Sequence, residues 1–271
     1  MNVNLDPVEK LFPVAIQQAL KLVDPSWLPV VIEGLKAISS VDIDYLPGLI
    51  EGQFLPTAGK MFAAFSMPLD QVRYILVGEG PYPRDQSATG FCFMDGAVSD
   101  LWSTEAQGGL SKKVNRATSL RNFIKMLLVA DGHLDVNHTT ATAMATISAF
   151  ARKANSGLIQ SLPELQKNMI DHGFLLLNAS LVFRPDVAPM RDARAWQAFL
   201  QVIFSALNEY QHSSVGKPIS LVLWGKIAAQ LKQIPASDFF PHVIAEHPYN
   251  LSFIANELMQ NFFSPMRLLS K

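Results

Sequence analysis

Four short, continuous apolar runs alternate with longer stretches of helical spacing, and this alternation constrains the fold more than any other feature of the chain. The runs are RYILV (Arg73–Val77), FLLL (Phe174–Leu177), ISLVL (Ile219–Leu223) and HVIA (His242–Ala245). None of them alternates polar with apolar residues, which is typical of strands buried on both faces of a parallel sheet. They predict a central four-stranded parallel sheet.

Three segments have the apolar periodicity of amphipathic helices: Ser119–Val129, Ala193–Asn208 and Ile227–Gln233. Strands that alternate with helices indicate βαβ units and an α/β fold of three layers, α/β/α. We find no repeat, low-complexity tract or linker, and we therefore expect one domain over residues 1–271. Asp95–Thr118 is expected to be a surface loop, and the latter part of Asp131–Gly157 a helix.

The composition is that of a globular protein without a strong overall charge. Hydrophobic residues make up 49% and the formal net charge is −1, so DNA binding would have to depend on a local basic patch, backbone amides or hydroxyls. The single cysteine, Cys92, cannot form an internal disulfide, which fits a reducing compartment. We recognise no signal peptide, and the apolar runs are too short to cross a bilayer, so we expect a cytoplasmic protein without a membrane partner.

Each apolar run is followed by residues that look unlike a core. These are GEGPYP (Gly78–Pro83), Asn178, Trp224–Gly225 and EHP (Glu246–Pro248). Ligands of open α/β sheets bind at the carboxyl ends of the strands. We therefore expect one site, formed by several loops at this edge.

The segment GEGPYPRDQSATGFCF (Gly78–Phe93) resembles the water-activating motif of family 1 uracil-DNA glycosylases, which begins Gly-Gln-Asp-Pro-Tyr-His and ends Gly-Leu-Cys-Phe. The spacing from Gly78 to Phe93 matches that motif without a gap. Further segments resemble that family in the same order along the chain. They are PTAGKMFAAF (Pro56–Phe65), SLRN (Ser119–Asn122), FLLLNASLVFR (Phe174–Arg184), Leu223–Gly225 and AEHPYNLS (Ala245–Ser252).

The resemblance implies a monofunctional DNA glycosylase. Such an enzyme flips uracil or a related pyrimidine out of single- or double-stranded DNA and hydrolyses its N-glycosidic bond, leaving an abasic site. It implies no metal, no organic cofactor and a monomer. The alternative is a catalytically degraded protein of the same fold that acts as a DNA-binding or replication-accessory module.

The resemblance also assigns the base pocket. Gly78, Glu79 and Gly80 match its first loop. Asn178 matches the residue that reads the uracil edge, because a carboxamide offers both a donor and an acceptor. Phe93 matches the aromatic platform under the base, and Tyr82 the ring that excludes a 5-methyl group; for Phe93 an ordinary core position is the alternative.

A second group of residues matches the loop that enters DNA. His247 matches the donor to the oxygen on which charge develops as the bond breaks, a role like that of an oxyanion hole. Leu251 matches the intercalating wedge, with core packing as the alternative, and Pro248 and Ser252 belong to the same DNA-binding loop.

The motif departs from the family at its water-activating aspartate, which falls on Gly80. Asp85 is one candidate to replace this aspartate, since it lies six residues after Glu79, the spacing of an acidic residue in the iron–sulfur branch of the superfamily. Glu79 itself is a second candidate. The third possibility is a site that binds a base or DNA without catalysing a reaction. We predict that Asp85 orients the water more than Glu79 does. That branch binds its cluster with several cysteines and this chain has one, so we expect no cluster.

The segment after the second apolar run also departs from the family, which has a polar, histidine-bearing loop there. This chain instead carries Arg184, Arg191 and Arg194. They either hold phosphate or form a solvated face.

Overall fold

The computed structural model describes residues 11–271. Most of the N-terminal segment in which we recognise no signal peptide therefore lies outside the described residues. The chain forms two compact units from interleaved segments. Unit 1 contains the chain up to Asp95, Gly173–Val222 and Ile227–Val243, and unit 2 contains Gly96–His172, Leu223–Lys226 and Ile244–Lys271. The expectation of a single domain stays a prediction.

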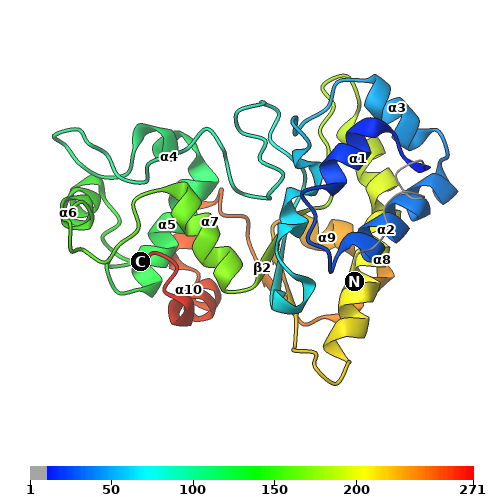
Figure 1. The fold of residues 1–271 in the computed structure, drawn as a ribbon. Coiled ribbons are helices and arrows are strands. Elements are labelled where there is room, and N and C mark those ends of the chain that lie inside the picture. Colours follow the sequence, from blue (N-terminus) through cyan, green and yellow to red (C-terminus); the bar gives the residue numbers. More distant parts are fainter. Residues whose placement is uncertain (1–10) are drawn as a thin grey trace. The chain divides into compact units, whose positions relative to one another are not determined.

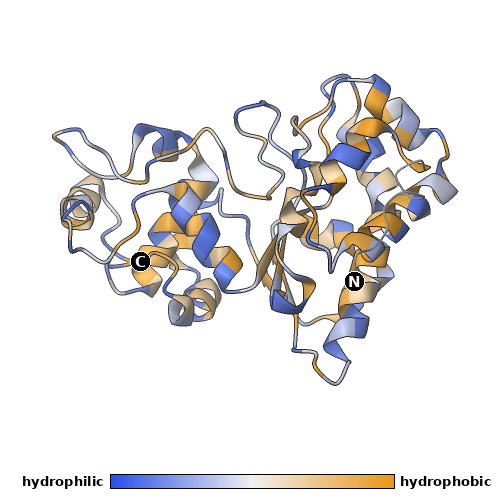
Figure 2. Cartoon of the chain, viewed as in Figure 1, coloured by the Kyte–Doolittle hydropathy of each residue, from blue (hydrophilic) through white to orange (hydrophobic). Residues whose placement is uncertain are grey.

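The predicted α/β class with a four-stranded parallel sheet is confirmed. The strands are β1 (Tyr74–Gly78), β2 (Phe174–Asn178), β3 (Ser220–Trp224) and β4 (His242–Ala245), in the order β2-β1-β3-β4. β1 and β2 pair in parallel from Tyr74 with Phe174 to Gly78 with Asn178. The strands are apolar along most of their length (Figure 2), and their carboxyl ends carry the loops singled out above.

The expectation of burial on both faces is wrong for β4. Its His242 is exposed, and Ile244 is 49% exposed. β4 lies at one edge of the sheet, where fewer neighbours cover it. β2 lies at the other edge and is nevertheless buried throughout.

The helices of unit 1 range from 5 to 23 residues in length. They are α1 (Val14–Leu20), α2 (Leu28–Val41), α3 (Tyr45–Glu51), α8 (Pro189–Gln211) and α9 (Ile227–Leu231), with 3₁₀ turns at Lys60–Ser66, Leu69–Gln71 and Pro235–Phe239. α2 packs along α8 (Figure 1). Gly34 permits this close approach, because a Cβ there would lie 2.5 Å from Phe199. The helices expected at Ala193–Asn208 and Ile227–Gln233 are α8 and α9.

Unit 2 is helical around an aromatic core. Its helices are α4 (Lys112–Arg116), α5 (Thr118–Ala130), α6 (Ala141–Ala151), α7 (Leu162–Asp171) and α10 (Glu257–Phe263), with 3₁₀ turns at Leu251–Ala255 and Ser264–Met266. Trp224 packs against Phe123, Phe253 and Phe263 with ring centroids 5.3, 5.4 and 6.3 Å apart. α5 and α6 confirm the helices expected in Ser119–Val129 and Asp131–Gly157.

The expectation of a surface loop at Asp95–Thr118 is wrong in part. The segment contains α4, and Leu101, Trp102 and Leu110 are buried. The Trp102 indole donates to the Ile159 carbonyl at 2.8 Å. A few well-spaced apolar side chains therefore anchor a segment whose average composition is that of a loop.

Candidate base-binding and catalytic site

The carboxyl ends of β1 and β2 continue as a paired edge beyond the strands. The Ala179 amide donates to the Gly78 carbonyl at 2.7 Å, and the Ser180 amide donates to the Glu79 carbonyl at 3.1 Å. A Cβ on Gly78 would lie 2.9 Å from Asn178 Oδ1. Glycine is thus required at Gly78, since any side chain there would displace the Asn178 carboxamide.

Asn178 is 2% exposed, and its Oδ1 has no hydrogen-bond partner among the described residues. A buried polar atom left without a partner costs about 1–3 kcal/mol. Native proteins satisfy nearly all such atoms, so an exception calls for a physical explanation. Here the atom belongs to a carboxamide fixed at a strand end, where ligands of α/β proteins bind, and it fits an acceptor reserved for a ligand N–H.

The Tyr82–Phe93 segment is held against the same two strands. The Cys92 amide donates to the Leu176 carbonyl at 3.0 Å, and its thiol contacts the Leu76 carbonyl at 3.1 Å. Phe93 has φ 66°, a left-handed conformation that costs a non-glycine residue about 1–3 kcal/mol. The Tyr82 hydroxyl donates to the Phe93 carbonyl at 3.5 Å. Burial, with a contribution from the Asp95 charge, holds the pKa of Tyr82 well above its usual value, so its ring stays uncharged.

The two candidate carboxylates line different cavities of unit 1. Glu79 is exposed and lines a cavity of about 280 Å³ together with Gly80 and Ser180. Asp85 lines a cavity of about 620 Å³ beside Thr57, whose hydroxyl donates to Asp85 Oδ1 at 2.5 Å. Asp85 is therefore held at one oxygen, whereas no hydrogen bond from a described residue fixes the Glu79 side chain.

Gly80 has room for a side chain. A Cβ there would lie 3.7 Å from the Ser180 carbonyl oxygen, which is ordinary van der Waals contact. The absence of a carboxylate at this position is therefore not imposed by packing.

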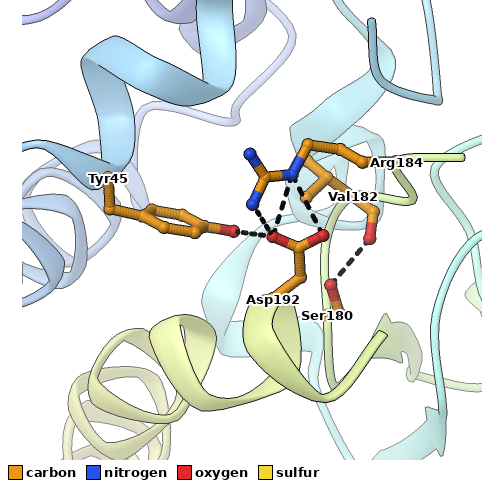
Figure 3. A network of polar contacts seen from close by, with 5 residues as sticks. All are labelled: Tyr45, Ser180, Val182, Arg184 and Asp192. Carbon is orange, nitrogen blue, oxygen red and sulfur yellow. Dashed lines mark hydrogen bonds and ion pairs between the residues drawn. The ribbon is translucent and has the colours of Figure 1, made fainter. Parts of the chain in front are cut away.

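Arg184 does not form a solvated face, because its side chain is largely buried and is paired within the protein. Its guanidinium forms a bidentate ion pair with buried Asp192, with Nη2 to Oδ1 at 2.6 Å and Nε to Oδ2 at 3.2 Å (Figure 3). The Tyr45 hydroxyl donates to the same carboxylate at 2.7 Å. This network fixes the start of α8 near the segment after β2. Arg191 and Arg194 are exposed.

In unit 2, His247 lies two residues beyond β4 and is exposed. The Tyr249 amide donates to His247 Nδ1 at 3.1 Å, so in the neutral imidazole the proton lies on Nε2. Gly225 has φ 70°, and a Cβ there would lie 2.8 Å from the His247 Cβ. The loop therefore presents His247 as an N–H donor through Nε2.

The loop after His247 is fixed by a residue whose role the sequence did not reveal. Asn122 on α5 is completely buried, and its Nδ2 donates to the carbonyls of Pro248 at 2.8 Å and of Tyr249 and Asn250 at 3.3 Å. Its position in the SLRN segment was the available signal. Leu251 follows the clamped carbonyls.

The side chains of this loop divide by exposure. Leu251 is 68% exposed, which opposes the core alternative and fits a wedge, and Ser252 is also exposed. Pro248 is buried, so it contributes to the loop through its backbone.

Within residues 11–271, no group of three or more histidine, cysteine, aspartate or glutamate side chains is arranged to hold a metal ion. In the same part of the chain, every helix is too short or too polar to cross a bilayer.

Known proteins resemble this chain at two levels, in the fold and in the sequence. A mimivirus UNG structure is 16% identical with a TM-score of 0.52, covering 90% of this chain and 77% of that one, and shows the fold alone. The UNG crystal structure from Nitratifractor salsuginis is 36% identical with a TM-score of 0.83 and covers both chains completely. The uracil-DNA glycosylase of Corynebacterium glutamicum is 27% identical over 228 residues, 84% of this chain and 80% of that protein. No family model matches the chain. The protein belongs to the uracil-DNA glycosylase family.

Proposed function

We propose that this protein is a monofunctional DNA glycosylase that removes uracil from DNA and initiates base excision repair. The observation that carries the proposal is the buried Asn178 carboxamide, whose Oδ1 is without a partner among the described residues. Uracil offers an N–H beside a carbonyl, which a carboxamide matches as acceptor and donor. Cytosine presents the opposite pattern on one of these positions and would leave a buried group unpaired, which selects against it.

Two further side chains define the base. The Phe93 ring offers a stacking surface worth about 1–3 kcal/mol per base. Tyr82 remains uncharged and occupies the matched position beside it, where its ring excludes a 5-methyl group. The left-handed backbone of Phe93 fits a residue whose orientation is fixed by function.

Breaking the N-glycosidic bond moves negative charge onto the base and positive charge onto the sugar. His247 is preorganised by its bond from the Tyr249 amide to donate through Nε2 to a base oxygen, and this donor stabilises the developing anion. Leu251, exposed in the same loop, fills the gap left by the extruded nucleotide.

Water then attacks the sugar carbon that the base has left, and its proton passes to a carboxylate. We assign this role to Asp85 rather than Glu79, because Thr57 holds one Asp85 oxygen and leaves the other to orient water. Glu79 is the alternative, since its backbone pairs with the segment that follows Asn178.

The test is single-turnover cleavage of single- and double-stranded oligonucleotides that carry one uracil, followed by alkaline strand scission. We expect Asp85→Asn to lose about 100-fold in rate, as for loss of a general base, and Glu79→Gln to lose less. The reverse order would transfer the role to Glu79. If the wild type binds uracil-DNA but stays inert, the protein is a binding module. The expected monomeric state and cytoplasmic location stay predictions.

A further inference from the structure

A third cavity, of about 310 Å³, opens beside the exposed wedge in unit 2. Leu251 forms one wall, Arg121 and Lys125 of α5 form another, and the Gly108–Gly109 turn contributes backbone. Of the residues that line it, none is acidic. The roles assigned above use Leu251 but neither of the two cations, Arg121 and Lys125, that line this cavity.

The two cations in its wall lack a counterion in the part of the chain that the structure describes. Arg121 and Lys125 are four residues apart and therefore share one face of α5. Arg121 donates to the side-chain oxygen of Asn122 and to the carbonyl of Asn115, each at 3.3 Å. Lys125 donates to the Thr139 carbonyl at 2.7 Å. All three acceptors are uncharged.

Partial burial and the neighbouring Arg121 charge both lower the pKa of Lys125. Two positive charges held close together in a recess without an acid raise each other's energy, and a bound anion would relieve this repulsion. The chain as a whole offers no broad positive field, because its formal net charge is −1. In a chain of this composition, a local basic site is one of the features by which the DNA backbone can be bound, beside backbone amides and hydroxyls.

We propose that the cavity lined by Arg121, Lys125 and Leu251 binds a backbone phosphate of the DNA next to the position that the wedge enters. The proposal rests on the proposed function, since it takes DNA as the ligand. A guanidinium and an ammonium are the two side-chain groups that proteins use most for phosphate.

The hydrogen bonds link this phosphate site to the catalytic loop. Arg121 Nε donates to Asn122 Oδ1, and Asn122 Nδ2 holds the carbonyls of Pro248 and Tyr249. A phosphate that orders Arg121 therefore also orders the residue that clamps the loop. Binding of the backbone and placement of the wedge are coupled through one buried asparagine.

The experiment measures the dissociation constant of the full-length protein for an oligonucleotide with a tetrahydrofuran abasic analogue, as a function of salt. Each lost phosphate contact should reduce the slope of log K against log salt by about 0.7–0.9. We expect this reduction and weaker binding for Lys125→Gln and Arg121→Gln, with Lys125→Arg close to wild type. Lys167→Gln is the matched control, because it removes the same charge from unit 2 where Lys167 pairs with Asp171; its slope should not change.

Unchanged slopes for both Lys125→Gln and Arg121→Gln would overturn the proposal, as would equal reductions in Lys167→Gln. Weaker binding with an unchanged slope would assign the cavity to an uncharged group such as a base and would also overturn it. The probe cannot be cleaved, so the binding result does not depend on catalysis. If the variants show the expected slopes but the wild type fails to cut uracil-DNA, the enzymatic proposal is contradicted and the phosphate site is supported.

Discussion

Replacing Asn122 by alanine should slow catalysis, although Asn122 lies behind the loop that carries His247 and Leu251. The variant removes three hydrogen bonds to consecutive loop carbonyls. The Asn250 carbonyl also accepts from the Phe253 amide at 3.2 Å and stays paired. Tyr249 is exposed, so water can replace the partner of its carbonyl. The uncompensated loss is thus chiefly that of the buried Pro248 carbonyl.

One buried carbonyl left without a partner costs about 1–3 kcal/mol. At 1.4 kcal/mol per tenfold, this lowers the ratio of ordered to disordered loop by about 5- to 150-fold. The single-turnover rate on uracil-DNA should fall by up to this factor, because only the ordered loop presents the Nε2 donor. The matched control is Asn168→Ala, which removes bonds from Nδ2 to the carbonyls of Leu268 at 2.9 Å and Ser270 at 2.7 Å, away from the loop.

A purely structural role is separated from positioning by two readouts. Asn168→Ala should lower the melting temperature without slowing cleavage, whereas Asn122→Ala should do both. In a His247→Ala background, Asn122→Ala should cost much less than alone, because positioning an absent donor has no value. Equal rates for folded Asn122→Ala and wild type, or full additivity with His247→Ala, would refute the reasoning.

Three other substitutions test the site and its support. Gly80→Asp should raise the cleavage rate, by up to about 100-fold, because its Cβ meets nothing closer than Ser180 at 3.7 Å; Gly80→Asn should not, and a loss of activity in both would show that the loop needs glycine. Tyr82→Ala should admit thymine, a discrimination of about 1–3 kcal/mol, while Tyr82→Phe keeps it; selectivity that survives in Tyr82→Ala would remove this ring from the pocket. Arg184→Met should destabilise the fold by about 3–5 kcal/mol in urea unfolding, since it leaves Asp192 buried without a counterion, and Arg184→Met with Asp192→Leu should recover part of this loss; a single variant as stable as wild type would contradict the role of the ion pair.

The strands and the largest helices could be predicted from the sequence because their signals are local. A continuous apolar run or a 3.6-residue period is set by neighbours in the chain, so β1, β2 and α5 were predicted within one or two residues of their bounds. The exposure of β4 could not be predicted, since it depends on the order of strands in the sheet and not on the run HVIA itself.

The candidate site could be predicted only in part, because some of its residues act through contacts that are distant in the sequence. Asn178 and His247 follow strands and match a known motif, whereas Asn122 acts on carbonyls 126 to 128 residues away. A long-range bond to the backbone leaves no local pattern in the sequence. Arg184 was misjudged likewise, because its partner Asp192 is buried by the start of α8, which the helical period alone placed four residues too late.

Two glycines and one missing carboxylate at the strand ends have different physical causes. Gly78 lies against Asn178, and Gly225 lies against His247, each at a distance where a Cβ would come within 3 Å of that side chain. These glycines are demanded by geometry, since Asn178 and His247 each pack against a neighbouring glycine backbone. Gly80 meets no such contact and has no left-handed φ. Packing therefore does not impose glycine at Gly80, and an aspartate introduced there should test how water is activated under the proposed function and not whether the loop can form.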